Sequence, residues 1–261
     1  MNISLIGKKA LVGGSSQGIG RAIGEQLAAS GASVTLMARS GDKLKHIISE
    51  LPTDHGQQHQ YLEVDFTDFS SYKEIIGNFF KINSVDILVN NTQGPASGGA
   101  MEKTVEDYQA AFDLLFKTVV HTSELALKGM IDQQFGRIIN IASVSVKEPL
   151  SYLTLSNSIR AAVTTWAKTL AADVGKHGIT VNSTLTGYFD TERLKNLNSA
   201  KAKSFGIALE EVNKQMLNNV PVGRFGDPKE YGYLVAFLAS EQASFITGTN
   251  IPIDGGMLKS F

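Results

Sequence analysis

The sequence of 261 residues contains no cysteine and no long apolar run. Without cysteine there is no disulfide framework, thiolate metal site or cysteine nucleophile. No run approaches the roughly 18 residues that a membrane-spanning helix needs, and no charged-then-apolar leader opens the sequence, so we expect a cytoplasmic protein with no membrane partner. A net charge of −1 gives no electrostatic reason to bind nucleic acid. The five histidines lack metal-ligand spacing, so we expect no metal site.

A glycine-rich stretch, Gly13 to Gly20, is the most informative part of the chain. It follows a strand-like apolar run, Lys9 to Val12, and precedes a helical pattern, Arg21 to Ser30, with a second strand at Ser33 to Met37. Glycine tolerates positive φ and lets the backbone approach a diphosphate, and the amides of the following helix then face the anion. This βαβ context predicts nucleotide binding, with a plain tight turn as the alternative.

The second strand ends at Ala38, and Arg39 follows it. In dinucleotide-binding folds this position lies beside the adenosine ribose, where an acid favours a free 2′-hydroxyl and an arginine favours a 2′-phosphate. Arg39 therefore favours NADP over NAD. The alternative is that Arg39 is a solvated loop residue.

Strand and helix patterns alternate along the rest of the chain, with no proline-rich linker to divide it. Further expected strands are Tyr61 to Val64, Val85 to Val89, Gly136 to Ser143, Ile179 to Leu185 and Asn250 to Asp254; further expected helices are Asp42 to Leu51, one capped by Asp68 or Thr67 that runs to Lys81, Val105 to Gln134, Ser156 to Lys176 and Asp227 to Ser240. We predict an α/β fold: a single-domain, Rossmann-type, doubly wound parallel sheet of about seven strands over residues 1–261. A polar helical insertion at 190–220 is expected to cover the substrate.

Several motifs together resemble the short-chain dehydrogenase/reductase family, closest to its 3-oxoacyl-(acyl-carrier-protein) reductase-like members. The matching residues are Gly14, Gly18 and Gly20 of the cofactor turn, Asp65, Asn90-Asn91, Ser143, Thr186-Gly187 with Thr191, and Thr247-Gly248 through Asp254-Gly255-Gly256. The resemblance covers essentially the whole chain. It implies a cofactor site formed by Gly14, Ser16, Gln17, Gly18, Ile19, Gly20, Arg39, Asp65, Phe66, Asn91, Arg160, Thr186, Gly187 and Thr191.

The chain departs from the family pattern at the proton chemistry. The family carries a tyrosine thirteen residues after the serine and a lysine four residues later, where this chain has Ser156 and Arg160 after Ser143. The family's active-site asparagine aligns with Leu115. Ser156 and Arg160 lie one helical turn apart and face the same side. The resemblance implies that Ser143, Ser156 and Arg160 surround the reacting carbonyl; alternatively, Ser156 caps its helix and Arg160 makes a surface salt bridge.

Three functions remain open at this point. The first is an NADP(H)-dependent oxidoreductase acting on a ketone or secondary alcohol, with Tyr152, Tyr188 or a water held by the serines as proton donor. The second is a catalytically silent NADP(H)-binding protein that partners or regulates, and the third is a non-redox enzyme that reuses the pocket. The resemblance also implies a homo-oligomer, a tetramer, and a small-molecule substrate.

Overall fold

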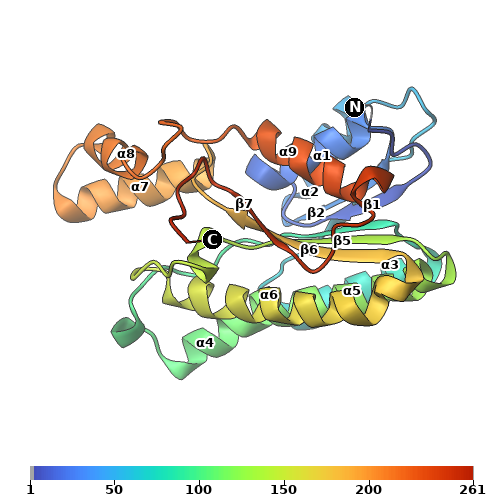
Figure 1. The fold of residues 1–261 in the computed structure, drawn as a ribbon, viewed down its shortest axis with the longest axis horizontal. Helices are drawn as coiled ribbons and strands as arrows, with labels where there is room; N and C mark the ends of the chain where they lie inside the picture. Colours follow the sequence, from blue (N-terminus) through green and yellow to red (C-terminus); the bar gives the residue numbers. More distant parts are fainter. Residues whose placement is uncertain (1–2, 261) are drawn as a thin grey trace.

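The sheet of this protein consists of seven parallel strands, seen edge-on in the ribbon of the computed structural model, which describes residues 3–260 (Figure 1). The strands are β1 (Lys9–Val12), β2 (Ser33–Ala38), β3 (Gln60–Glu63), β4 (Ile87–Asn90), β5 (Gly136–Ile141), β6 (Ile179–Thr186) and β7 (Asn250–Ile253). Their order across the sheet is β3-β2-β1-β4-β5-β6-β7, so the chain reverses its winding direction between β1 and β4. This confirms the doubly wound Rossmann-type sheet.

Helices cover both faces of the sheet. They are α1 (Gly18–Ala29), α2 (Gly41–Glu50), α3 (Phe69–Ile82), α4 (Val105–Phe112), α5 (Thr118–Asp132), α6 (Thr154–Val174), α7 (Glu192–Phe205), α8 (Leu209–Leu217) and α9 (Pro228–Ala239). Helices α1, α2 and α9 lie on one face, and α4, α5 and α6 lie on the other with α3 (Figure 1). Within residues 3–260, no helix is long and apolar enough to cross a membrane.

Strand β1 shows why two layers of helices are needed. Ala10 and Val12 belong to the core under α1 and α9, while Leu11 between them belongs to the core under α3, α5 and α6. Successive side chains of a strand point to opposite faces. A strand segment covered on both sides is therefore apolar at consecutive positions, as Ala10 to Val12 are, whereas Lys9 at the start of β1 is exposed.

The long helical stretch expected from Val105 to Gln134 is present from Val105 to Asp132, but it contains a π turn that was not predicted. A π-helical turn, Asp113–Lys117, separates α4 from α5 and contains the buried Leu115. Apolar periodicity continues across such a turn, so the sequence pattern did not show it. π turns are frequent at functional sites.

The remaining boundaries differ by a few residues from those expected. Asp68 caps α3, as predicted, by accepting a hydrogen bond from the Ser71 amide at 3.0 Å. Helix α6 begins at Thr154 with Leu153 as its N-cap, so Ser156 does not cap it. The polar segment at 190–220 forms α7 and α8, which extend beyond the sheet at one end (Figure 1).

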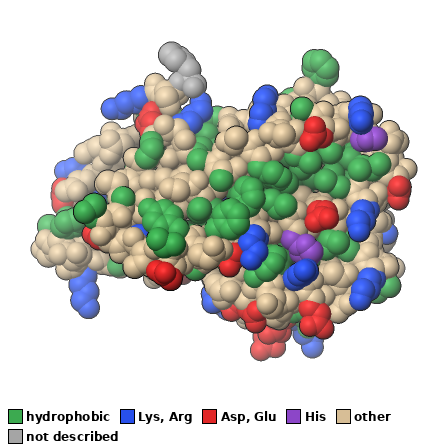
Figure 2. Space-filling view, turned by 90° about the horizontal axis from the view of Figure 1, so that it is seen from below, with side chains coloured by type: hydrophobic (Ala, Val, Ile, Leu, Met, Phe, Trp, Pro, Cys, Tyr) green, Lys and Arg blue, Asp and Glu red, His purple; other side chains and the backbone are tan. Residues whose placement is uncertain are grey.

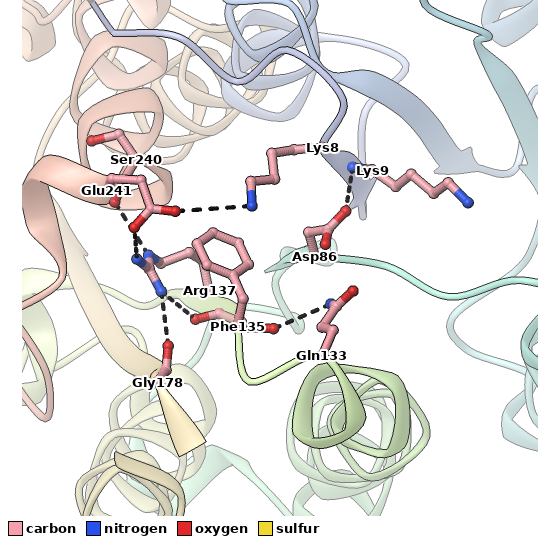
Figure 3. Close-up of polar contacts among 10 residues, drawn as sticks. Lys8, Lys9, Asp86, Gln133, Phe135, Arg137, Gly178, Ser240 and Glu241 are labelled. Atoms are coloured by element: carbon pink, nitrogen blue, oxygen red, sulfur yellow. Dashed lines mark hydrogen bonds and ion pairs between the residues drawn. The ribbon is translucent and has the colours of Figure 1, made fainter. Parts of the chain in front are cut away.

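A buried cation closes the opposite, amino-terminal end of the sheet (Figure 3). Arg137 of β5 is 1% exposed, and its guanidinium lies 3.7 Å from a carboxylate oxygen of Glu241. Both cations lie over the ring of Phe135, with the Arg137 guanidinium carbon 4.2 Å and the Lys8 ammonium nitrogen 3.5 Å from its centroid. Arg137 also donates to the carbonyl oxygens of Gly136, Gly178 and Ser240. Burial lowers the pKa of Arg137, and Glu241 opposes that effect.

Candidate active site

A cleft of about 1000 Å³ opens at the carboxyl end of the sheet, where the winding direction reverses. Ligands of doubly wound sheets bind at this position. The residues that line the cleft are Gly14, Ser16, Gln17, Gly18, Ile19, Gly20, Ala38, Arg39, Ser40, Gly41, Asp42, Lys43, Tyr61, Glu63, Phe66, Asn91, Thr92, Gln93, Thr191, Glu192, Arg193 and Asn196.

The glycine turn at the floor of the cleft has the geometry that a diphosphate requires. Gly14 and Gly18 both have a φ of +57°, which side-chain-bearing residues rarely adopt. A Cβ on Gly13 would overlap the carbonyl oxygen of Asn91. Gln17, the N-cap of α1, forms no side-chain cap. The amides of the first turn therefore remain available to an anion, and the turn fits the phosphates of a dinucleotide.

Two polar side chains fix the conformation of this turn by hydrogen bonds to neighbouring strands. The Ser15 hydroxyl is buried and accepts a hydrogen bond from the Met37 amide at 2.9 Å. The Asn91 side chain donates to the Gly13 carbonyl at 3.0 Å. The loop after β1 is thereby tied to β2 on one side and to the end of β4 on the other.

The outer part of the cleft contains the residues predicted to select the cofactor. Arg39 and Phe66 both line it. Asp65 does not line it, and instead accepts hydrogen bonds from the amide and hydroxyl of Thr67, at 2.9 Å and 2.7 Å. These two bonds lower the pKa of Asp65, and the charge of Arg39 adds a smaller effect in the same direction. Asp65 thus remains a carboxylate beside the cation.

Ser143 follows the end of β5, and the side chain of Arg160 reaches the last residue of the same strand. The Ser143 hydroxyl accepts a hydrogen bond from the Ser145 amide at 3.1 Å, so its own proton is free to be donated outward. Arg160 donates to the carbonyl of Ile141, and it forms no ion pair among residues 3–260. Burial, together with the nearby charge of Arg193, lowers the pKa of Arg160 to about 10, which leaves it cationic at neutral pH.

Arg160 also lines a small cavity of about 10 Å³ together with Asn90, Thr92 and Asn140. Asn90 donates to the side-chain oxygen of Asn140 at 2.8 Å, while the Asn140 amide nitrogen has no hydrogen-bond partner among residues 3–260. Leu115 of the π turn lines the same cavity. A space of this size has room for about one water molecule.

The turn after β6 is shaped by its neighbours. A Cβ on Gly187 would lie 2.6 Å from the Cα of Asp254, so only glycine fits beside β7. The Thr186 hydroxyl is hydrogen-bonded to the Tyr231 hydroxyl at 2.8 Å. Thr191 caps α7, and its methyl group would lie 3.3 Å from a Cβ on Gly18. The start of α7 is therefore placed against the glycine turn.

The cleft contains most of the predicted cofactor residues but not all of them. Asp65, Arg160, Thr186 and Gly187 do not line it. Ser156 lies half-buried on α6, one turn before Arg160. Sequence reasoning missed Lys43 and Arg193, which line the cleft from α2 and α7. Their proximity to Arg39 and Thr191 in the sequence was the available signal.

Two tyrosines that were candidate proton donors, Tyr152 and Tyr188, do not line the cleft. Tyr152, in the segment before α6, and Tyr188, in the loop after β6, lie close enough for each to affect the pKa of the other. Burial raises the pKa of both, that of Tyr188 to about 12. Each is therefore a weaker acid than a solvated tyrosine.

Comparison with known proteins identifies the family of this chain. A family model described as enoyl-(acyl carrier protein) reductase matches residues 14–258. The 3-oxoacyl-[acyl-carrier-protein] reductase FabG of Haemophilus influenzae is 35% identical over 254 residues, covering 97% of this chain and 99% of that protein. The chain belongs to the short-chain dehydrogenase/reductase family.

Other members of the family with similar sequence or structure use the phosphorylated dinucleotide. The NADPH-dependent reductase BacG of Bacillus subtilis is 32% identical over 257 residues, covering 97% of this chain and 98% of that protein. The structure of L-sorbose reductase from Gluconobacter frateurii, complexed with NADPH and L-sorbose, superposes with a TM-score of 0.92 at 31% identity and covers 100% of both chains. The fold of this chain is thus that of dinucleotide-dependent carbonyl reductases.

Proposed function

We propose that this protein is an NADP(H)-dependent oxidoreductase that interconverts a ketone and a secondary alcohol, in the manner of 3-oxoacyl reductases. The observation that carries the proposal is the glycine turn. Its backbone has positive φ angles, and its unpaired amides lie at a cleft large enough for a dinucleotide. When bound, the nicotinamide supplies or accepts the hydride. The protein itself has to bind the cofactor, orient the substrate beside it and supply a proton to the substrate oxygen.

The cofactor would be held along the whole cleft. Backbone amides from Gly14 to Gly20 would bind the diphosphate at the start of α1, where the helix dipole favours an anion. Arg39 would bind the 2′-phosphate, and Asp65 with Phe66 would border the adenine. Asn91, Thr186, Gly187, Thr191 and Arg160 would surround the nicotinamide riboside.

Ser143, Ser156 and Arg160 would form the polar site at the carbonyl, with Ser156 and Arg160 in the family's tyrosine and lysine positions. The Ser143 hydroxyl oxygen already accepts a hydrogen bond from the Ser145 amide. Its hydroxyl proton would therefore be donated to the carbonyl oxygen of the substrate. A serine hydroxyl is a poor acid, so it would stabilise the developing alkoxide by hydrogen bonding. Arg160 would add a fixed positive charge that favours the same anion.

The proton itself would come from a water held by the two serines, or from Tyr152 or Tyr188. The raised pKa values of the tyrosines make them poorer donors. General acid catalysis contributes roughly 10²–10⁴ in rate, so an enzyme that lacks the tyrosine would be slowed without being inactive.

A catalytically silent NADP(H)-binding protein is the second candidate, and a non-redox enzyme the third. The silent form is favoured by one observation: Leu115 is 2% exposed and lines the small cavity beside Arg160, where the family has a polar asparagine. In that case the chain would bind the cofactor without turning over any carbonyl compound.

Titration with NADPH and NADH, followed by fluorescence, tests the cofactor assignment. We expect tighter binding of NADPH, and tighter binding of NADH would contradict the role of Arg39. A panel of ketones added to the NADPH complex then tests turnover through absorbance at the reduced nicotinamide band. Oxidation of NADPH by a ketone supports the reductase, whereas binding without oxidation across the panel supports the silent protein.

We also propose that the chain forms a homo-oligomer, a tetramer. Apolar side chains gather on the helical face seen in Figure 2. Phe112 and Phe116 stack at 4.9 Å, and Trp166 of α6 contacts Phe116 edge-on at 6.3 Å; all three are only half-buried. Such a surface is suited to a second copy of the chain. A monomer mass in light scattering would refute this.

A further inference from the structure

The segment that follows β7, residues 254–260, contacts both of the turns that carry predicted active-site residues. A Cβ on Gly187, in the turn after β6, would lie 2.6 Å from the Cα of Asp254. Farther along the segment, Met257 and Leu258 pack against a small apolar cluster formed by Ala142, Val144 and Leu185. The segment therefore packs on the residues that flank Ser143 on either side.

A carboxylate joins this segment to the same turn. Glu148 lies in the loop that continues from Ser143, and a single oxygen of its side chain, Oε1, accepts hydrogen bonds from the amides of Lys259 and Ser260, both at 2.8 Å. These two bonds lower the pKa of Glu148, so it is a carboxylate at neutral pH. Hydrogen bonds to a charged acceptor are stronger than those between neutral groups. Glu148 thus fixes the far end of the segment.

The near end of the segment is fixed by a second carboxylate. Asp254 accepts hydrogen bonds from the amides of Gly256 and Leu258, at 3.0 Å and 2.8 Å. A Cβ on Gly255 would lie 2.8 Å from the Val220 side chain, so the backbone also packs closely on the loop before α9. The segment therefore has one conformation between the turn after β6 and the turn after β5.

The turn that carries Ser143 is a single 3₁₀ turn, Val144–Val146. The Ser143 hydroxyl accepts a hydrogen bond from the Ser145 amide, and its carbonyl accepts one from the Val146 amide, both at 3.1 Å. The orientation of the hydroxyl therefore follows the orientation of the turn. Hydrogen bonds in 3₁₀ turns have poor geometry, so contacts from outside are needed to hold such a turn in one position.

We propose that Glu148 is a positioning residue, which together with the segment 254–260 holds the Ser143 hydroxyl in the orientation that donates to the carbonyl oxygen of the substrate. This inference rests on the proposed reductase function. Neither Glu148 nor the segment lines the cofactor cleft, so their effect reaches the substrate through Ser143 and not through the cofactor.

The test compares Glu148→Ala with Ser260→Pro, which removes one donor of the same contact because proline has no amide hydrogen. With a ketone that the wild type reduces, Glu148→Ala should lower kcat by about 10- to 100-fold, since a misplaced catalytic group costs a rate factor of that order. Ser260→Pro should cause a smaller loss. Glu148→Gln should also lose less, because its amide oxygen still accepts both hydrogen bonds. The Kd for NADPH should stay unchanged in all three variants.

A double-mutant cycle separates positioning from a merely structural role. In a Ser143→Ala background, Glu148→Ala should lower kcat no further, because the group on which it acts is already missing. Asp86→Ala is the matched control. Asp86 also accepts a hydrogen bond from a backbone amide, that of Lys9 at 2.7 Å, but it lies at the amino-terminal end of the sheet (Figure 3). We expect this variant to keep the wild-type kcat.

Amide hydrogen exchange in the peptide 143–148 gives a readout that needs no substrate. Exchange should be faster in Glu148→Ala than in the wild type and in Asp86→Ala, because the turn opens more often when the segment is released. Glu148→Ala is the variant in which this exchange and kcat should change together.

Unchanged exchange in this peptide, a wild-type kcat in Glu148→Ala or Ser260→Pro, or an equal loss from Glu148→Ala with and without Ser143 would overturn the inference. A raised Kd for NADPH in Glu148→Ala would also overturn it, because the effect would then pass through the cofactor. If the wild type binds NADPH but reduces no ketone, the proposed function itself fails, and the exchange measurement alone decides whether the segment holds the turn of Ser143.

Discussion

Replacement of Gly20 by alanine should weaken NADPH binding by about 10- to 150-fold. A Cβ at this position would overlap the Gly14 carbonyl oxygen and would lie 2.8 Å from the Asn91 side-chain nitrogen. The obstacle is backbone rather than a flexible side chain, so the turn has to shift. Loss of one charge-assisted hydrogen bond to the diphosphate costs roughly 1.5–3 kcal/mol, which is the affinity range above. Overpacking should also destabilise the fold by about 1–3 kcal/mol.

Gly77 provides the matched control. It lies in α3, and a Cβ there would meet no atom within 4 Å. Alanine is a better helix former than glycine by about 0.5–1 kcal/mol. Gly77→Ala should therefore raise the melting temperature by roughly 1–4 °C and leave the NADPH affinity unchanged.

The assay combines thermal and urea unfolding with fluorescence titration of NADPH for the two variants and the wild type. Opposite signs of the stability change are the expected result. If Gly20→Ala binds NADPH with the wild-type affinity, the diphosphate does not depend on the close approach of this turn. The steric argument would then be wrong, whatever the stability of the variant.

Three further outcomes are expected. Arg39→Gln should raise the Kd for NADPH by about 10- to 100-fold and leave that for NADH nearly unchanged; a parallel loss for both coenzymes would contradict a 2′-phosphate contact. Tyr152→Phe and Tyr188→Phe, made separately, test the tyrosine donor: unchanged kcat/KM in both excludes it, while a loss of about 10²-fold or more in one identifies it. Arg137→Met should destabilise the fold by about 3 kcal/mol or more, because three buried carbonyl groups lose their hydrogen-bond donor. Glu241→Gln should cost about 1 kcal/mol or less, because the Glu241 side chain is 67% exposed. Equal losses in urea unfolding would show that the ion pair, and not the carbonyl contacts, holds this cluster.

Local features of this protein could be predicted from the sequence because neighbouring residues determine them. The turn from Gly13 to Gly20, the cap at Asp68 and the alternation of strands with helices all depend on contacts within a few residues. The right-handed rule for parallel strands then left few possible sheets. The sequence therefore predicted the doubly wound fold and where along the chain the cleft residues stand.

Contacts between distant segments were decided only by the tertiary structure. The π turn around Leu115 keeps the apolar pattern of an unbroken helix, so no local signal marks it. Arg137 carries a charge that predicts exposure, yet the packing of β5 against the end of α9 buries it. Arg193 lines the cleft only because the start of α7 packs against the glycine turn that follows β1. Which charges meet across a cleft depends on chain segments tens of residues apart, and the energy of such an encounter is not encoded in any one of them.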